Sequence, residues 1–264
     1  MAKSRLDALL VDRGLFETRS RAAAAVIAGD VRLGDEGRRA DKPGQMVRPD
    51  VPVAVAEGPR YVSRGGVKLA NALSAFDLDV RGRCALDVGA STGGFTDCLL
   101  QEGAERVIAV DVAYGELHWK IRNDARVTVL ERVNARSLSP DDLPYAPDLI
   151  VADVSFVSLR KALPAPIACA GDAWDCLAMV KPQFEVGRER VGKGGVVRSA
   201  EDRREALVGF AGWARESIGA VVLGFASSGL PGPAGNLETF VWLAEPGRAG
   251  GLDDLEVGAR EVEP

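Results

Sequence analysis

"LDVGASTGGFTD", residues 86–97, decides the fold class because it joins an apolar stretch to a glycine-rich turn. The apolar residues around Asp87 indicate a strand, and the spacing of apolar residues after Gly94 predicts a helix. Glycine at such a junction allows a tight turn and lets the backbone approach a ligand closely. The stretch therefore predicts a strand–turn–helix unit of an α/β protein.

The glycines of this turn are not spaced as G-x-G-x-x-G, the fingerprint of dinucleotide sites. The alternative to a ligand loop is an ordinary strand–helix turn, but the number of glycines and the acid at the strand end favour a cofactor. The predicted cofactor-binding residues of this stretch are Asp87, Gly89, Ala90, Ser91, Gly93, Gly94 and Phe95.

Strands and helices alternate through the rest of the chain after residue 63, which predicts a mostly parallel, doubly wound sheet. The last two strands have no helix between them, so we expect an antiparallel hairpin at one edge. The expected strands are 84–89, 106–112, 127–133, 149–154, 176–181, 220–230 and 238–245. The expected helices are 63–78, 93–103, 116–123, 159–170 and 200–219.

The first sixty residues have the pattern of a separate α+β module. Two short helices are expected, the first ending at Gly14 and the second running from an N-cap at Ser20 to Gly29. Two strands follow, and the turn-forming "EGPR" at 57–60 closes the module. The expected organisation is a domain over 1–59, a linker over 60–64, a second domain over 65–250 and an acidic tail over 251–264, solvated or partly disordered.

Composition excludes several classes of protein. The four cysteines show no C-x-x-C spacing and the chain has one histidine, which argues against a zinc site and a disulfide framework. No apolar run approaches 18 residues and the N-terminus has no signal-peptide pattern, so we expect a soluble, cytoplasmic protein without a membrane segment. The net charge of −5 argues against a uniformly basic surface.

A local basic face remains compatible with that charge. Residues 1–60 hold 11 Lys/Arg and 9 Asp/Glu. A solvated surface is the simpler interpretation of arginines on short helices, and weak net charge alone favours it. The residues that could form one basic face are Arg5, Arg13, Arg19, Arg21 and Arg32.

Acids and a lysine end the expected strands, where ligands bind in open α/β sheets. Asp111 is placed to accept hydrogen bonds from ribose hydroxyls, as in both NAD and S-adenosylmethionine sites, and does not separate the two. Asp153 follows an apolar strand and is either a helix N-cap or a group facing the crevice. Lys181 ends "CLAMVK", and Lys68 and Glu238 are candidates for its second cation and for an acid that keeps both lysines together.

Several motifs together resemble the TlyA family, often labelled hemolysin A. They are "SRGGVKL", "DVGASTGGFTD", "DVAYGEL", "RNDARVTVLERVNAR", "ADVSFVSL", "VKPQFEVG", "GKGGVVR" and "GNLETF", and they span nearly the whole chain. The second domain is similar to FtsJ-type ribose methyltransferases with a Rossmann-like sheet. The first sixty residues resemble the S-four-type RNA-binding domain of ribosomal proteins, which favours the basic face over the solvated surface.

The resemblance implies an S-adenosylmethionine-dependent 2′-O-methyltransferase that acts on cytidines of 16S and/or 23S ribosomal RNA. The catalytic Lys-Asp-Lys-Glu tetrad of FtsJ-like enzymes falls on Lys68, Asp153, Lys181 and Glu238. Asp153 is also counted among the cofactor-binding residues, with Asp111. One departure is the linker, where family members can carry Arg-Ala-Trp and this chain has "EGPRYVS".

Two other functions stay open at this point. One is a membrane-active hemolysin, against which the absence of a spanning segment argues. The other is a non-catalytic protein that binds ribosomal RNA, against which the complete tetrad argues. The glycine-rich and basic stretch 186–199 is either a mobile loop that closes over RNA or cofactor, or a simple surface loop.

Overall fold

The computed structural model describes residues 3–56 and 58–263. The chain divides after Arg60 into two compact units, residues 1–60 and 61–264. Of the predicted linker 60–64, Tyr61 is buried in the second unit and Arg64 begins its first helix.

The first unit packs two helices against short strands. Helix α1 (Leu6–Asp12) and helix α2 (Arg19–Ala28) bury Leu6, Leu10 and Val26 in one small core. Strand β1 (Ser4–Arg5) pairs with β4 (Met46–Val47), and β2 (Val31–Leu33) lies between β3 (Arg38–Arg39) and β5 (Val53–Val55).

The N-cap of α2 differs from the prediction. Thr18 has the extended backbone of a cap and its hydroxyl accepts from the Arg21 amide at 3.3 Å, whereas Ser20 lies inside the helix. Both residue types are good caps, so only the backbone conformation separates them. Gly29 ends the helix as predicted, with a φ of 91°.

The second unit is built on a seven-stranded sheet with the order β11-β12-β10-β9-β6-β7-β8. Strands β10, β9, β6, β7 and β8 are parallel, and β12 runs antiparallel to both of its neighbours, which confirms the predicted hairpin at one edge. The strands are β6 (Cys84–Val88), β7 (Arg106–Asp111), β8 (Val127–Glu131), β9 (Leu149–Ala152), β10 (Asp175–Val180), β11 (Val221–Ser227) and β12 (Thr239–Ala244).

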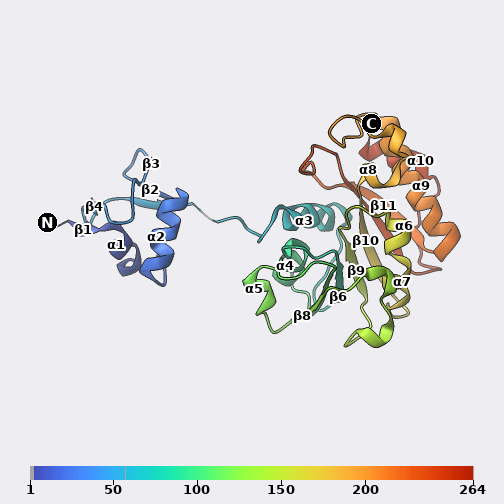
Figure 1. Cartoon of the computed structure of the whole chain (residues 1–264), viewed down its shortest axis with the longest axis horizontal. Coiled ribbons are helices and arrows are strands. Elements are labelled where there is room, and N and C mark those ends of the chain that lie inside the picture. The colour runs from blue at the N-terminus through green and yellow to red at the C-terminus, as the bar shows by residue number, and fades with distance from the viewer. Residues whose placement is uncertain (1–2, 57, 264) are drawn as a thin grey trace. The chain divides into compact units, whose positions relative to one another are not determined.

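Helices cover both faces of this sheet (Figure 1). Helices α3 (Arg64–Phe76), α4 (Gly94–Gln101) and α5 (Trp119–Arg122) lie on one face. The other face carries α6 (Leu159–Ala162), α7 (Pro164–Ala168), α9 (Ala200–Ile218) and α10 (Leu255–Val262). Side chains alternate along each strand, so Leu86 packs in one core cluster and Ala85 in the other.

Two predicted elements have a different form. The expected helix 159–170 is two short helices, because Pro164 and Pro166 remove backbone donors from its middle. The tail 251–264 contains α10, which contacts α9 and β11 rather than standing in solvent. Ala259 is fully buried, and buried Glu263 pairs with Arg203 at 2.8 Å.

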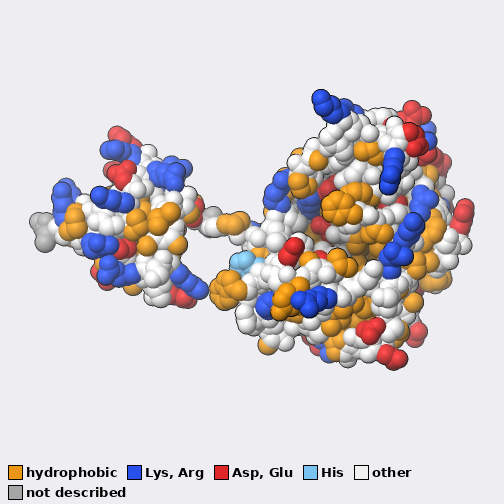
Figure 2. All heavy atoms as spheres, in the orientation of Figure 1, with side chains coloured by type: hydrophobic (Ala, Val, Ile, Leu, Met, Phe, Trp, Pro, Cys, Tyr) orange, Lys and Arg blue, Asp and Glu red, His pale blue; other side chains and the backbone are white. Residues whose placement is uncertain are grey.

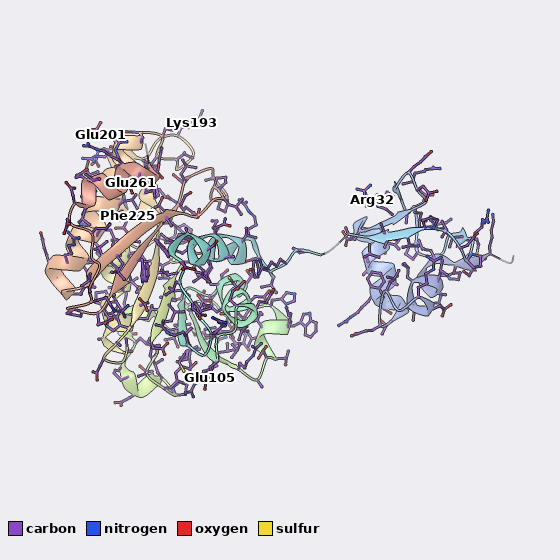
Figure 3. All side chains as sticks on the ribbon, turned by 180° about the vertical axis from the view of Figure 1, so that it is seen from behind. Arg32, Glu105, Lys193, Glu201, Phe225 and Glu261 are labelled. Carbon is purple, nitrogen blue, oxygen red and sulfur yellow. The ribbon has the colours of Figure 1, made fainter. Side chains whose placement is uncertain are left out.

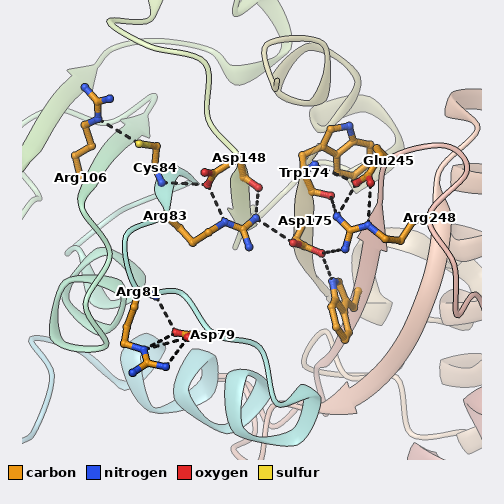
Figure 4. A network of polar contacts seen from close by, with 11 residues as sticks. Asp79, Arg81, Arg83, Cys84, Arg106, Asp148, Trp174, Asp175, Glu245 and Arg248 are labelled. Carbon is orange, nitrogen blue, oxygen red and sulfur yellow. Dashed lines mark hydrogen bonds and ion pairs between the residues drawn. The ribbon is translucent and has the colours of Figure 1, made fainter. Parts of the chain in front are cut away.

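The amino-terminal edge of the sheet is closed by a polar network (Figure 4). Asp175, which begins β10, is 3% exposed and accepts from Trp242 Nε1 at 2.8 Å. It also pairs with Arg83 at 3.0 Å and Arg248 at 3.3 Å. Arg83 in turn pairs with Asp148 at 2.9 Å. The network ties together the starts of β6, β9 and β10, at the sheet edge away from the strand ends that carry the predicted site.

Candidate active site

The glycine-rich turn after β6 is shaped by its neighbours. Gly89 has a φ of 86°, and a Cβ there would lie 2.7 Å from the Asp153 carbonyl oxygen. Ser91 also has a left-handed backbone, with a φ of 47°, and its amide donates to Asp111 Oδ2 at 2.7 Å. The other Asp111 oxygen accepts from the Ala113 amide at 2.8 Å. The turn is thus fixed against the ends of β7 and β9 and leaves no room for a side chain at residue 89.

Two cavities open at this edge of the sheet, of about 460 Å³ and about 520 Å³. Both have Gly89, Ser91, Asp153 and Ser155 in their walls. Asp111 lines the first cavity, hereafter the Asp111 cavity. Lys68, Lys181 and Glu238 line the second, hereafter the lysine cavity, together with Asp153. The structure therefore brings the four residues of the predicted tetrad into one cavity, next to the glycine turn.

The tetrad forms two ion pairs. Lys181 Nζ lies 2.6 Å from Asp153 Oδ1 and donates to Ser155 Oγ at 2.7 Å. Lys68 pairs with Glu238 and both are almost fully buried. Each lysine thus has its own carboxylate, rather than one glutamate holding both. Asp153 is not a helix cap, because α6 is capped by Ser158.

Asp87 lies beneath the turn rather than in the wall of either cavity. Its side chain is fully buried and one carboxylate oxygen accepts from the Thr96 amide at 3.0 Å and hydroxyl at 2.7 Å. The other oxygen has no hydrogen-bond partner in the described part of the chain. Burial raises the pKa of Asp87 to about 7; the Thr96 hydrogen bond opposes this, and the nearby charge of Asp153 adds to it.

The remaining predicted residues of the turn have different surroundings. Ala90 and Phe95 line the lysine cavity, and the Phe95 ring lies 5.8 Å from that of Phe240. Gly94 also lines it, and a Cβ on this residue would lie 2.1 Å from Ser63 Oγ. Gly93 is absent from the walls of the two cavities and faces Leu117. Gly93 and Gly94 thus permit close packing around α4.

Residues that the sequence reasoning missed lie in the segment after β9. Ser155 holds Lys181, and Phe156 is 92% exposed in the wall of the Asp111 cavity. The Phe156 backbone is left-handed, with a φ of 66°, and its ring lies 5.5 Å from that of Phe184. The sequence "DVSFVS", in which an aromatic residue and two serines follow a strand end, could have indicated these residues. Val112, which is 67% exposed, is a further apolar wall residue of this cavity.

The five predicted RNA-binding arginines have different partners in the first unit. Arg5 and Arg19 converge on Asp7, at 2.7 and 3.1 Å, and hold the pKa of that carboxyl well below its usual range. Arg21 pairs with Glu17 at 2.5 Å. On the face of the first unit that Figure 2 shows, Lys and Arg side chains are spread out with Asp and Glu among them.

Arg13 and Arg32 have no carboxylate partner within the described residues. Arg13 donates to the Pro49 carbonyl at 2.5 Å, and Arg32, on β2, donates to the Gly37 carbonyl at 3.1 Å (Figure 3). Their positive charges are therefore not offset by an ion pair in this part of the structure.

The basic loop 186–199 has internal structure. It contains a short 3₁₀ turn, η3 (Arg188–Arg190), and a bridge between Gly192 and Val196, with Lys193 at its outer side (Figure 3). Buried Asn236 accepts from the Val197 amide at 2.9 Å and donates to the Gly195 carbonyl at 2.8 Å. These bonds fix the loop to the segment that leads into β12.

Metal sites and membrane-spanning helices are both absent from the described residues. Over residues 3–56 and 58–263, no group of three or more His, Cys, Asp or Glu side chains is arranged to hold a metal ion. Over the same residues, no helix combines the length and apolar character that a membrane crossing requires.

Known proteins resemble this chain over most of its length. Residues 61–245 match the family of FtsJ-like methyltransferases. A Mycobacterium tuberculosis protein named 16S/23S rRNA (cytidine-2'-O)-methyltransferase TlyA is 48% identical over 243 residues, which cover 91% of this chain and 90% of that protein. Hemolysin A of Brachyspira hyodysenteriae is 37% identical, over 77% of this chain and 84% of that protein.

A solved structure from Streptococcus thermophilus, described as a candidate hemolysin, matches with a TM-score of 0.73 and 39% identity. The match covers 99% of this chain and 96% of that chain. The family match spans the unit that carries the tetrad, and the similarity to the relatives extends beyond it. The chain therefore belongs to the TlyA family of FtsJ-like methyltransferases.

Proposed function

We propose that this chain transfers a methyl group from S-adenosylmethionine to the 2′-hydroxyl of cytidines in 16S ribosomal RNA, 23S ribosomal RNA or both. The observation that carries the proposal is the wall that the two cavities share. Asp153 lies in this wall, so one residue of the tetrad lines both the Asp111 cavity and the lysine cavity. Family membership and the name of the M. tuberculosis relative support the same reaction.

The Asp111 cavity fits the cofactor. Gly89 and Asp111 both line this cavity, and the Asp111 carboxylate is an acceptor suited to ribose hydroxyls. Exposed Val112 offers an apolar surface for a base. When bound, the cofactor supplies a methyl group made electrophilic by its sulfonium. The chain's own task is therefore to prepare and orient the hydroxyl.

Lys181 is the residue we assign to that task. Its Nζ is held by Asp153 and Ser155, which line both cavities, and Lys181 itself lines the lysine cavity, which we assign to the ribose. We assign to Lys181 the role of accepting or steering the hydroxyl proton, and general-base catalysis of this kind contributes about 10²–10⁴-fold. Holding the two reactants in line contributes on the order of 7–11 kcal/mol more.

Lys68 and Glu238 have a supporting role in this proposal. Their ion pair is nearly sealed from solvent and adds no net charge to the lysine cavity. It keeps a second ammonium beside the lysine cavity with its own carboxylate. We assign to this pair the electrostatic environment of Lys181 and the placement of the ribose.

RNA as the substrate is supported by two further features. Exposed Phe156 presents a ring at the cavity rim, and aromatic rings stack on unpaired bases in RNA recognition. The first unit carries the arginines that we assign to the phosphate backbone: Arg5, Arg13, Arg19, Arg21 and Arg32. With ribosomal RNA or ribosomal subunits as its partner, the chain would act in the cytoplasm.

Methyl transfer to isolated ribosomal subunits tests the proposal. The purified chain is incubated with labelled cofactor and each subunit, and the label is mapped to ribose or base. We expect ribose labelling by the wild type, and loss of labelling with retained cofactor binding for Lys181→Ala. Base methylation, or full activity of Lys181→Ala, contradicts the assignment, and cofactor binding without any transfer favours a non-catalytic RNA-binding protein.

A further inference from the structure

The segment after β9 carries Asp153 and Ser155 and contains a strained residue, Phe156. Phe156 has a φ of 66°, a left-handed backbone that is strained for a residue with a side chain. Such a conformation persists only where neighbouring groups hold it. The residues that hold this segment therefore decide where Asp153 and Ser155 place Lys181.

The holding contacts come from one short helix. Helix α8 (Pro182–Glu185) begins directly after Lys181, which is its N-cap. Lys181 contacts Asp153 and Ser155, and the Phe184 ring lies 5.5 Å from that of Phe156. The far end of the helix contributes Glu185, which no assignment above uses.

Glu185 binds the end of the same segment. Its carboxylate accepts from Ser158 Oγ at 2.7 Å and from the Leu159 amide at 2.7 Å, and its side chain is 2% exposed. The nearest cation is Arg160, whose Nε lies 3.8 Å away, too far for a hydrogen bond. Burial raises the pKa of Glu185, and the two hydrogen bonds oppose that rise.

Glu185 is not the only residue that caps α6. Ser158 already caps α6 by accepting from the Arg160 amide at 3.2 Å, so the helix does not need a carboxylate to begin. Hydrogen bonds to an ionised acceptor are shorter and about twice as strong as neutral ones. They suit a contact that must hold a strained backbone at a fixed distance.

We propose that Glu185 is a positioning residue for methyl transfer. Lys181 and Glu185 are four residues apart, one helical turn, and grip the two ends of the segment 153–159. These contacts at both ends of the segment fix the end of β9 against the end of β10. They thereby fix Asp153 and Ser155 around the Lys181 amine. This inference rests on the proposed function, because it explains how the amine is aimed at the hydroxyl.

The test compares full-length variants in steady-state methylation of the ribosomal subunit that the wild type modifies. Glu185→Ala removes both bonds, and a misplacement near 1 Å lowers rates by about 10²-fold, so we expect kcat to fall by about that factor. Glu185→Gln keeps an acceptor for the Leu159 amide, and Ser158→Ala keeps the carboxylate on that amide. Both should lose less than Glu185→Ala. KM for the subunit and cofactor Kd should change less than kcat does.

A matched control removes a carboxylate that also accepts from a backbone amide but lies near the amino-terminal ends of the parallel strands, away from the cavities. Glu245 accepts from the Trp174 amide at 3.1 Å and pairs with Arg248 at 2.8 Å. Glu245→Ala should lower thermal stability and leave kcat unchanged for folded protein. A wild-type kcat in folded Glu185→Ala, or an equal loss in both alanine variants, overturns the proposal.

Amide hydrogen exchange gives a readout that does not depend on activity. The Leu159 amide and its neighbours at 154–158 should exchange faster in Glu185→Ala and stay unchanged in Glu245→Ala. If the wild type methylates no ribosomal subunit, the proposed function fails while this exchange difference still stands. Unchanged exchange in Glu185→Ala overturns the positioning role in either case.

Discussion

Lys181 and Lys68 are both paired with carboxylates, but their surroundings differ. The Lys181 pair lies at the shared wall of the two cavities, and Asp153 keeps 26% of its side chain exposed. The Lys68–Glu238 pair is nearly sealed, so removing Glu238 leaves a buried ammonium without its partner, which is strongly destabilising. Substitution of Lys181 therefore reports on the chemistry more cleanly than substitution of Glu238.

Asp87 makes the stability of the cofactor-free protein depend on pH. Its pKa is about 7 in the folded chain and 3.8 for an unburied aspartate, so between these values the folded state binds more protons. Stability from this group is full below pH 3.8 and is lost as pH rises to about 7, by at most about 1.4 kcal/mol per pH unit. Asp87→Asn, which mimics the protonated form, should remove this slope.

Chemical denaturation of both proteins at pH 5 and pH 8 measures the difference. Asp87→Asn should gain stability relative to the wild type on going to pH 8, because only the wild type then buries a charge. The amide keeps an oxygen that can accept from Thr96, so the turn into α4 should persist. Parallel stability curves at the two pH values would show that Asp87 does not titrate in this range.

At the scale of elements, apolar runs and their breaks predicted the sheet. Each expected strand of the second unit is present, because runs such as "LIVA" at 149–152 can be buried on both faces only in a covered sheet. Glu238 was predicted to hold both lysines, but that it pairs with Lys68 while Asp153 pairs with Lys181 could not be predicted, since this depends on how α3 packs against the start of β12. The same holds for α10, whose acidic composition conceals the buried face around Ala259.

A substitution in the polar network at the amino-terminal ends of the strands should lower stability without changing activity. Asp175→Ala deprives Trp242 Nε1 of its acceptor and removes one partner from each of Arg83 and Arg248. Removing one partner of a buried ion pair costs roughly 3–5 kcal/mol, and both arginines keep a second carboxylate, so we expect about 3 kcal/mol. Because the network is remote from the cavities, methyl transfer per folded molecule should be unchanged.

The Asp79–Arg81 pair on the surface provides the control. Arg81 lowers the pKa of Asp79 to about 2, yet Asp79 is exposed and its pair is screened by water. Asp79→Ala should therefore leave the denaturation midpoint almost unchanged. A midpoint for Asp175→Ala as high as that of Asp79→Ala would mean that the buried network adds no stability.

For the molecule as a whole, the proposal assigns cofactor binding and methyl transfer to the second unit and RNA binding to the first. The cavities and the tetrad lie entirely in residues 61–264, and the arginines assigned to RNA lie in residues 1–60. Substitutions in the first unit should therefore change the binding of the ribosomal subunit and leave cofactor Kd as it is. The arginines without a carboxylate partner should contribute most, because their charge is not already offset.

Arg13→Gln and Arg32→Gln remove charges that form no ion pair within the described part of the first unit and donate to carbonyl oxygens there, and Arg21→Gln removes one already paired with Glu17. The plot of log affinity against log salt has a negative slope, and its magnitude falls by about 1 for each phosphate that the protein no longer neutralises. We expect the double variant Arg13→Gln/Arg32→Gln to bind ribosomal subunits more weakly with a shallower slope, and Arg21→Gln to change both quantities less. Equal slopes for the wild type and the double variant would place the RNA contacts on other residues.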